Sequence, residues 1–157
     1  MPYGADALYD RLLGGWLGRC VGCQLGKPVE GWVYQSEGPT RSIKNYLQGS
    51  NAYPLNDYIP QASPGWEGQS WARIRPEALP ATREHLRWAA RDDDQDYTIL
   101  GLDILETYGP NFTTTQVGEK WLKKLPYMQV YTAERQAYRN LVEGFVPPQT
   151  AIRWNPY

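Results

Sequence analysis

Three consecutive aspartates, Asp92, Asp93 and Asp94, are the residues of this chain whose type and spacing best suit chemistry. Adjacent carboxylates repel one another unless a cation or strong hydrogen-bond donors offset the repulsion. Magnesium and calcium ions take oxygen ligands, and neighbouring aspartates supply them from one short segment. The same residues also suit the solvent-exposed first turn of a helix, where backbone N–H groups favour negative charge. A hard-cation site and an acidic helix cap are therefore both open interpretations.

The chain has two cysteines and one histidine. Cys20 and Cys23 form a C-x-x-C pair, a pattern found in zinc sites and redox pairs. The second half of a zinc site is missing and no β-α-β pattern surrounds the pair, so small buried positions on a helix are the favoured interpretation. His85 has no identifiable Ser or Asp partner in the sequence, which argues against a nucleophile–base triad.

Composition narrows the class of protein. The 157 residues suffice for a single domain with a sizeable core. The 16 Lys and Arg residues nearly balance the 17 Asp and Glu residues and form no basic run, which argues against binding of a nucleic-acid polymer. No apolar segment is long enough to span a bilayer, and the N-terminus lacks a signal-peptide pattern, so we expect no membrane association and a cytoplasmic location.

A long helix over residues 6–24 is expected before the first possible site. Gly14, Gly18, Gly22 and Gly26 recur in it every four residues. Each glycine costs about 1 kcal/mol of helix propensity relative to alanine. Because a stripe of small residues lets another backbone approach closely, we expect a central helix in tight contact with its neighbours. Gly26 is expected to end it.

Further helices are expected to position the aspartates. They are predicted over residues 39–47, 94–108, 113–125 and 132–143, with a short helix at 82–90 inside a Pro- and Gly-rich loop of residues 50–91. So long a loop in a compact domain is usually functional. Ile99, Leu102 and Leu105 mark the expected apolar side of the 94–108 helix, and Leu100 and Ile104 widen it. No segment shows sustained period-2 alternation, so the fold class is predicted to be all-α.

Two local signatures resemble the ADP-ribosylglycohydrolase family, also called the dinitrogenase-reductase-activating glycohydrolase family. Residues 22–30 read G-C-Q-L-G-K-P-V-E, where the family has roughly G-D-x-x-G-x-P-x-E. Residues 92–98 read D-D-D-Q-D-Y-T, where the family has T-D-D-T. The order and spacing of the two motifs, together with the segment from Leu125 to Arg135, extend the resemblance over nearly the whole chain. It implies a truncated orthogonal helical bundle of the family's type.

The resemblance assigns roles to the matching positions. Asp93 and Asp94 match the paired metal-binding aspartates, and Asp92 stands where the family usually has a ligand threonine. Glu30 matches the glutamate that activates or positions the substrate. Cys23 replaces the aspartate of the first motif, which removes one acidic group.

Substrate contacts are expected from the same two motifs. Gly26 and Pro28 in the first and Tyr97 in the second are the expected substrate-binding residues. An aromatic surface for adenine would come from Trp66, Trp71 or Tyr97, although core packing is the favoured interpretation for each of these aromatics taken singly.

The implied reaction is the magnesium-dependent cleavage of an N- or O-glycosidic bond to ADP-ribose. It needs one or two Mg²⁺ ions to orient ribose hydroxyls and lower the pKa of a bound water. A carboxylate such as Glu30 would accept the proton of that water or stabilise the oxocarbenium-like carbon.

One departure from the family is large. The family's third motif, near G-G-D-x-D-T, supplies the remaining ligands of a two-metal site and does not occur in this sequence. The second metal site is therefore expected to be incomplete. Either the chain is a fragment or a natural truncation, or a second polypeptide or an oligomer completes the site, or the protein works without hydrolysis.

Three hypotheses follow. The first is the N-terminal portion of a magnesium-dependent ADP-ribosylglycohydrolase with little or no activity alone. The second is a non-catalytic module that binds ADP-ribose or a nucleotide, or an association partner. The third is a structural helical protein in which the aspartates form only a solvated cap.

Overall fold

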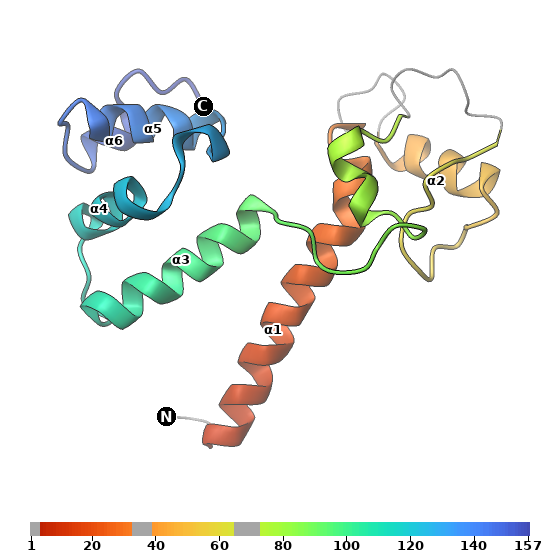
Figure 1. Cartoon of the computed structure of the whole chain (residues 1–157), viewed down its shortest axis with the longest axis horizontal. Helices are drawn as coiled ribbons and strands as arrows, with labels where there is room; N and C mark the ends of the chain where they lie inside the picture. The colour runs from red at the N-terminus through yellow and green to blue at the C-terminus, as the bar shows by residue number, and fades with distance from the viewer. Residues whose placement is uncertain (1–3, 33–38, 65–72) are drawn as a thin grey trace. The chain divides into compact units, whose positions relative to one another are not determined.

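The computed structural model describes residues 4–32, 39–64 and 73–157. The elements are α1 (Ala5–Gly26), η1 (Lys27–Val29), α2 (Pro39–Gly49), η3 (Pro76–Ala81), α3 (Asp93–Tyr108), α4 (Thr114–Lys124), η4 (Tyr127–Gln129), α5 (Thr132–Val142) and α6 (Gln149–Ile152), where η denotes a 3₁₀-helix. These described residues contain no β-strand, which confirms the all-α class. The chain divides into two compact units, Met1–Arg91 and Asp92–Tyr157, which are drawn in red to green and in green to blue (Figure 1).

The long helix predicted from the glycine-rich segment is α1. It ends at Gly26, as expected, but this glycine has a right-handed φ of −80° and leads directly into η1, so no left-handed cap ends the helix. No described atom would lie within 4 Å of a Cβ built on Gly14, Gly18 or Gly22. The glycine stripe therefore meets no close backbone within unit 1.

The end of α1 is tied to the end of unit 1 by one buried amide. Gln24 is 2% exposed, and its Nε2 donates to the carbonyl of Ala90 while its Oε1 accepts from the N–H of Ala90, both at 3.0 Å. Two backbone groups 66 positions away in sequence are thus satisfied by one side chain. Gln24 is the reason that α1 and the last residues of unit 1 meet.

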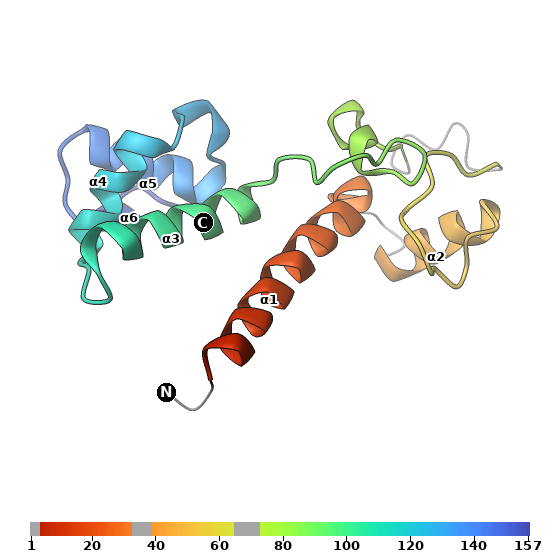
Figure 2. The same ribbon diagram turned by 60° about the horizontal axis from the view of Figure 1, so that its bottom comes forward.

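The core of unit 1 lies between α2, η1, η3 and the loop that follows α2 (Figure 1, Figure 2). Its buried members are Trp32, Tyr46, Leu47, Ile59, Ile74 and Ala78. The inward face of α2 is formed by Tyr46 and Leu47, which are buried, and by Ile43, which packs against the cluster. Tyr46 also donates its hydroxyl proton to the carbonyl of Pro60 at 2.8 Å, which fixes the loop to the helix.

The short helix expected at residues 82–90 is absent, and the prediction was wrong. The 3₁₀-helix η3 lies just before that segment instead, with Ala78 and Ala81 buried. Thr82 ends η3 in an extended conformation, and both its N–H and its hydroxyl donate to the carbonyl of Leu79. Beyond Thr82 only a single turn forms, because Thr82 to Ala90 carry no buried apolar stripe that a longer helix could pack.

Unit 2 is built from consecutive helices, each in contact with the next from α3 to α6 (Figure 1, Figure 2). Its buried core comprises Leu100, Ile104, Leu125, Val130 and Tyr138. The expected packing side of α3 was wrong in part: Ile99, Leu102 and Leu105 are exposed, whereas Leu100 and Ile104, which were expected to widen that side, are buried. Both sides of α3 are apolar, so periodicity alone does not say which of them meets α4.

Local signals for helix ends in unit 2 are confirmed. Thr113 and Gln116 form a reciprocal capping box at the start of α4. Gly144 has a φ of +86° just after α5, a conformation that favours glycine. Inside the unit, the buried Lys120 of α4 donates to Asp103 Oδ2 at 2.7 Å and to Thr107 Oγ1 at 2.8 Å, which joins α4 to α3.

Over the described residues no helix is both long enough and apolar enough to cross a bilayer.

Candidate functional site

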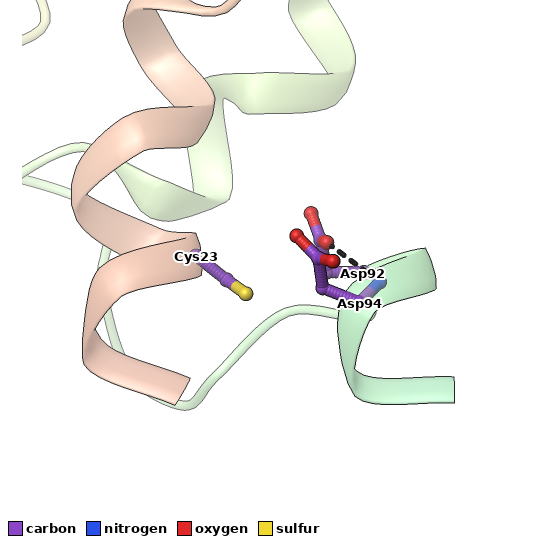
Figure 3. A group of neighbouring side chains, drawn as sticks. All are labelled: Cys23, Asp92 and Asp94. Atoms are coloured by element: carbon purple, nitrogen blue, oxygen red, sulfur yellow. Dashed lines mark hydrogen bonds between the residues drawn. The ribbon is translucent and has the colours of Figure 1, made fainter. Parts of the chain in front are cut away.

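The Asp triplet (Asp92, Asp93 and Asp94) forms the start of α3. Asp92 is the N-cap residue with extended backbone, and its Oδ1 accepts a hydrogen bond from the N–H of Asp94 at 3.1 Å (Figure 3). Aspartate is among the residues preferred at this position because its carboxylate satisfies an N–H group that has no partner inside the helix. The acidic helix cap considered from the sequence is therefore present.

The same cap concentrates negative charge. Carboxylate oxygens of Asp92 and Asp94 lie within 4.8 Å of each other. Partial burial raises the pKa of Asp93, and the neighbouring charges of Asp92 and Asp94 raise it further, against a backbone hydrogen bond that lowers it. The charges of Asp92 and Asp94 thus oppose ionisation of Asp93, and a cation near the helix start would reduce that repulsion.

Two further residues of α3 lie next to the Asp triplet in sequence. Gln95 is buried, and its Nε2 has no hydrogen-bond partner among the described residues. Tyr97 is half-buried and packs against the core of unit 2, with its ring centroid 5.5 Å from that of Trp121. One face of Tyr97 is therefore used for packing, and its contact with a substrate stays a prediction.

Glu30 lies in unit 1, immediately after η1. Its backbone N–H donates to the carbonyl of Lys27 at 3.3 Å, and Gly31 follows with a φ of +86°. Pro28, two residues earlier, is buried in η1, so its ring is part of the packing that holds the motif. Gly26 is exposed at the end of α1. The first motif is thus a tight turn that leaves the Glu30 side chain 64% exposed.

The Glu30 carboxylate has a partner that sequence reasoning missed. Arg75 Nη2 donates to Glu30 Oε2 at 3.0 Å, and Arg75 Nε lies 3.6 Å from Glu77 Oε1. Arg75 precedes η3 and follows the buried Ile74. No local pattern could have linked Glu30 to an arginine 45 residues away in a loop without periodicity.

The remaining candidates from the sequence are the two cysteines, the histidine and two tryptophans. Cys23, on the last turns of α1 (Figure 3), and Cys20 are half-buried and free of disulfides, as expected for small helix positions. His85 Nε2 is 2.7 Å from Gln61 Oε1, which pairs the ring with an amide and not with a nucleophile. Trp66 and Trp71 lie outside the described residues.

Unit 1 also contains a cavity of about 340 Å³. Its lining residues are Val21, Leu25, Leu55, Asn56, Asp57 and Tyr58. Neither Glu30 nor Arg75 borders it.

The geometry therefore gives an acidic helix start in unit 2 and a fixed, exposed glutamate in unit 1. That the two serve one site stays a prediction from the paired motifs.

Comparison with known proteins tests the resemblance carried by the two motifs. No curated protein and no solved structure matches the chain. The sequence model of one family, described as ADP-ribosylglycohydrolase, matches residues 4–155. That match spans both motifs and both units, so the resemblance noted from residues 22–30 and 92–98 is confirmed. The chain belongs to the ADP-ribosylglycohydrolase family.

Proposed function

We propose that this chain carries the magnesium-binding aspartates and the catalytic glutamate of a hydrolase that cleaves a glycosidic bond to ADP-ribose. The family is generally metal-dependent and acts on ADP-ribosylated substrates. The observation that carries the proposal is the Asp triplet at the start of α3, where carboxylates of Asp92 and Asp94 lie within 4.8 Å of each other. We further propose that the protein acts in the cytoplasm.

The Asp triplet fits a hard divalent cation. It supplies only carboxylate oxygens, the donors that Mg²⁺ prefers, from three adjacent residues. The raised pKa of Asp93, caused first by burial and then by the charges of Asp92 and Asp94, supports the proposal, because a cation would offset that repulsion. A magnesium ion bound by Asp92, Asp93 and Asp94 would supply Lewis acidity toward oxygen atoms of the substrate.

Glu30 is proposed to act on the reacting bond. Its carboxylate is exposed, and the backbone around it is anchored by the buried Pro28 and Trp32. A carboxylate in that setting can accept a proton from an attacking water or stabilise positive charge on the ribose carbon. Gly26, Pro28 and Tyr97 are proposed to contribute to substrate binding from the same two motifs.

The proposal includes a low activity for these 157 residues alone. The third family motif does not occur among them, so the ligands for a second ion are incomplete. Ligands from a complementing chain or another copy would complete the site. The second candidate function is a non-catalytic module that binds ADP-ribose or a nucleotide.

Two measurements on the purified chain test the proposal. Calorimetric titration with ADP-ribose, with and without Mg²⁺, should show binding that depends on Mg²⁺ and is lost in the Asp93→Ala/Asp94→Ala variant. Release of ADP-ribose from an ADP-ribosylated peptide should be slow and should fall to background in Glu30→Gln.

Binding without any turnover would favour the non-catalytic module. Absence of binding in both titrations would contradict both functions and leave the Asp triplet as a helix cap only. Rapid release by the chain alone would contradict the proposal that its ligand set is incomplete.

A further inference from the structure

We propose that Arg75 is a positioning residue for Glu30. Its guanidinium holds the Glu30 carboxylate in the orientation that meets the ribose of ADP-ribose, an inference that rests on the function proposed for Glu30. The observation behind it is the direct hydrogen bond from Arg75 Nη2 to Glu30 Oε2 at 3.0 Å. A charge-assisted bond of this length restricts the carboxylate more than a neutral partner would.

The backbones on both sides of this bond are fixed by one core. Val29 precedes Glu30, and Trp32 follows it by two residues. Trp32 is a buried member of the unit 1 cluster, and Val29 packs against that cluster. On the other side, Arg75 follows Ile74, which is also a buried member. The 3₁₀-helices η1 and η3, next to the two residues, are in contact. Only the two side chains are left to move, and their hydrogen bond holds them together.

The ion pair between Arg75 and Glu30 contributes little to the stability of the fold. The Arg75 and Glu30 side chains are 51% and 64% exposed, and pairs at such exposure add little to the free energy of folding. Orientation of a reacting carboxylate, in contrast, changes binding and rate steeply with small displacements. The two roles therefore predict different results when Arg75 is replaced.

Glu77 offers a matched control on the same guanidinium. Its Oε1 lies 3.6 Å from Arg75 Nε, a longer contact than the one to Glu30. Glu77 belongs to η3, two residues after Arg75, so this contact is local. Replacing Glu77 removes a carboxylate from Arg75 without touching Glu30.

The test is the affinity of the full chain for ADP-ribose in saturating Mg²⁺, measured by calorimetry. Arg75→Gln and Glu30→Gln should each weaken binding about tenfold, the loss typical of a hydrogen bond to a charged group. The double variant should be no weaker than Glu30→Gln, because Arg75 acts only through Glu30. Arg75→Lys keeps the positive charge and should stay within about threefold of the wild type. Glu77→Gln should bind like the wild type.

The outcomes separate the two proposals. A wild type that binds no ADP-ribose, or a Glu30→Gln variant with wild-type affinity, would contradict the function proposed for Glu30, and the role of Arg75 with it. Weak binding by Glu30→Gln beside wild-type binding by Arg75→Gln would overturn the role of Arg75 alone. Additive losses in the double variant would overturn it too, since Arg75 would then contact the ligand itself. A loss of affinity in Arg75→Lys equal to that in Arg75→Gln would also overturn the positioning role of Arg75.

Thermal unfolding excludes a trivial explanation. The melting temperature of Arg75→Gln should stay within about 3 °C of the wild type, because an exposed pair contributes little to folding. A larger drop would assign the pair to stability and overturn the positioning role.

Discussion

Replacement of Asp93 by asparagine should change stability in opposite directions with and without magnesium. Partial burial and the charges of Asp92 and Asp94 raise the pKa of Asp93 in the folded protein. An acid whose pKa is raised on folding disfavours the folded state once it is ionised. This destabilisation is absent below the ordinary carboxyl pKa of about 4 and is complete above the folded pKa. Metal-free Asp93→Asn should therefore be more stable than the wild type at neutral pH, and the difference should vanish near about pH 3.

The magnitude of the magnesium effect follows from linkage. Two carboxylates within 4.8 Å of each other repel by about 1 kcal/mol in a water-like medium, and a cation offsets that repulsion. At a free Mg²⁺ concentration 100-fold above the dissociation constant, binding stabilises the folded protein by about 2.7 kcal/mol. For a chain of this size that corresponds to a rise in melting temperature of about 5–11 °C. The Asp93→Asn variant should lose most of this rise.

Differential scanning fluorimetry or calorimetry over a magnesium series checks both effects. Asp96→Asn is the matched control, because Asp96 lies in the same first turn of α3 but is not among the proposed ligands. It should keep the magnesium response. A metal-free Asp93→Asn protein that melts below the wild type and still responds fully to Mg²⁺ would refute the reasoning.

Three further predictions concern the packing that holds the motifs. Gln24→Ala should lower the free energy of unfolding by about 2–3 kcal/mol in urea titrations, because the N–H and the carbonyl of Ala90 lose their hydrogen-bond partner; an unchanged midpoint would contradict the buried amide contact. Gly118→Ala should gain about 1 kcal/mol of helix propensity only in a Leu141→Ala background, because a Cβ at Gly118 would lie 2.7 Å from Leu141 Cδ2; an equal gain in both backgrounds would argue against that contact. Lys120 holds the pKa of Asp103 below its usual range through a hydrogen bond and its charge. The difference in unfolding free energy between the wild type and Lys120→Met should therefore be full at neutral pH and should shrink as pH falls below about 4. A difference that does not change with pH in urea unfolding would contradict this prediction.

Helix positions could be predicted from the sequence because their signals are local. Thr113 and Gln116 mark the start of α4, and Gly144 follows α5 with positive φ, as their residue types suggest. The packing side of α3 could not be predicted in this way. Leu100 and Ile104 lie inside and Ile99 outside, although all are similar in hydrophobicity. The choice between the two sides is made by packing against α4 and the residues that follow it, and the periodicity of α3 carries no information on that packing.

The candidate site could likewise be predicted only where its residues are close together in the sequence. The Asp triplet is adjacent in sequence, and its acidic first turn could be recognised from the residues alone. Glu30 could be recognised through its motif, but its hydrogen bond to Arg75 joins segments 45 residues apart. That hydrogen bond depends on the contact between η1 and η3 at the core of unit 1. The Pro- and Gly-rich loop has no periodicity from which this contact could be predicted.

The most direct measurement is anomalous X-ray scattering from crystals grown with Mn²⁺ in place of Mg²⁺ and with ADP-ribose. We expect a manganese peak about 2.2 Å from carboxylate oxygens of Asp93 and Asp94, with the Glu30 carboxylate in hydrogen-bond contact with the ribose. Bound ADP-ribose with no metal at the Asp triplet and no contact to Glu30 would contradict the account.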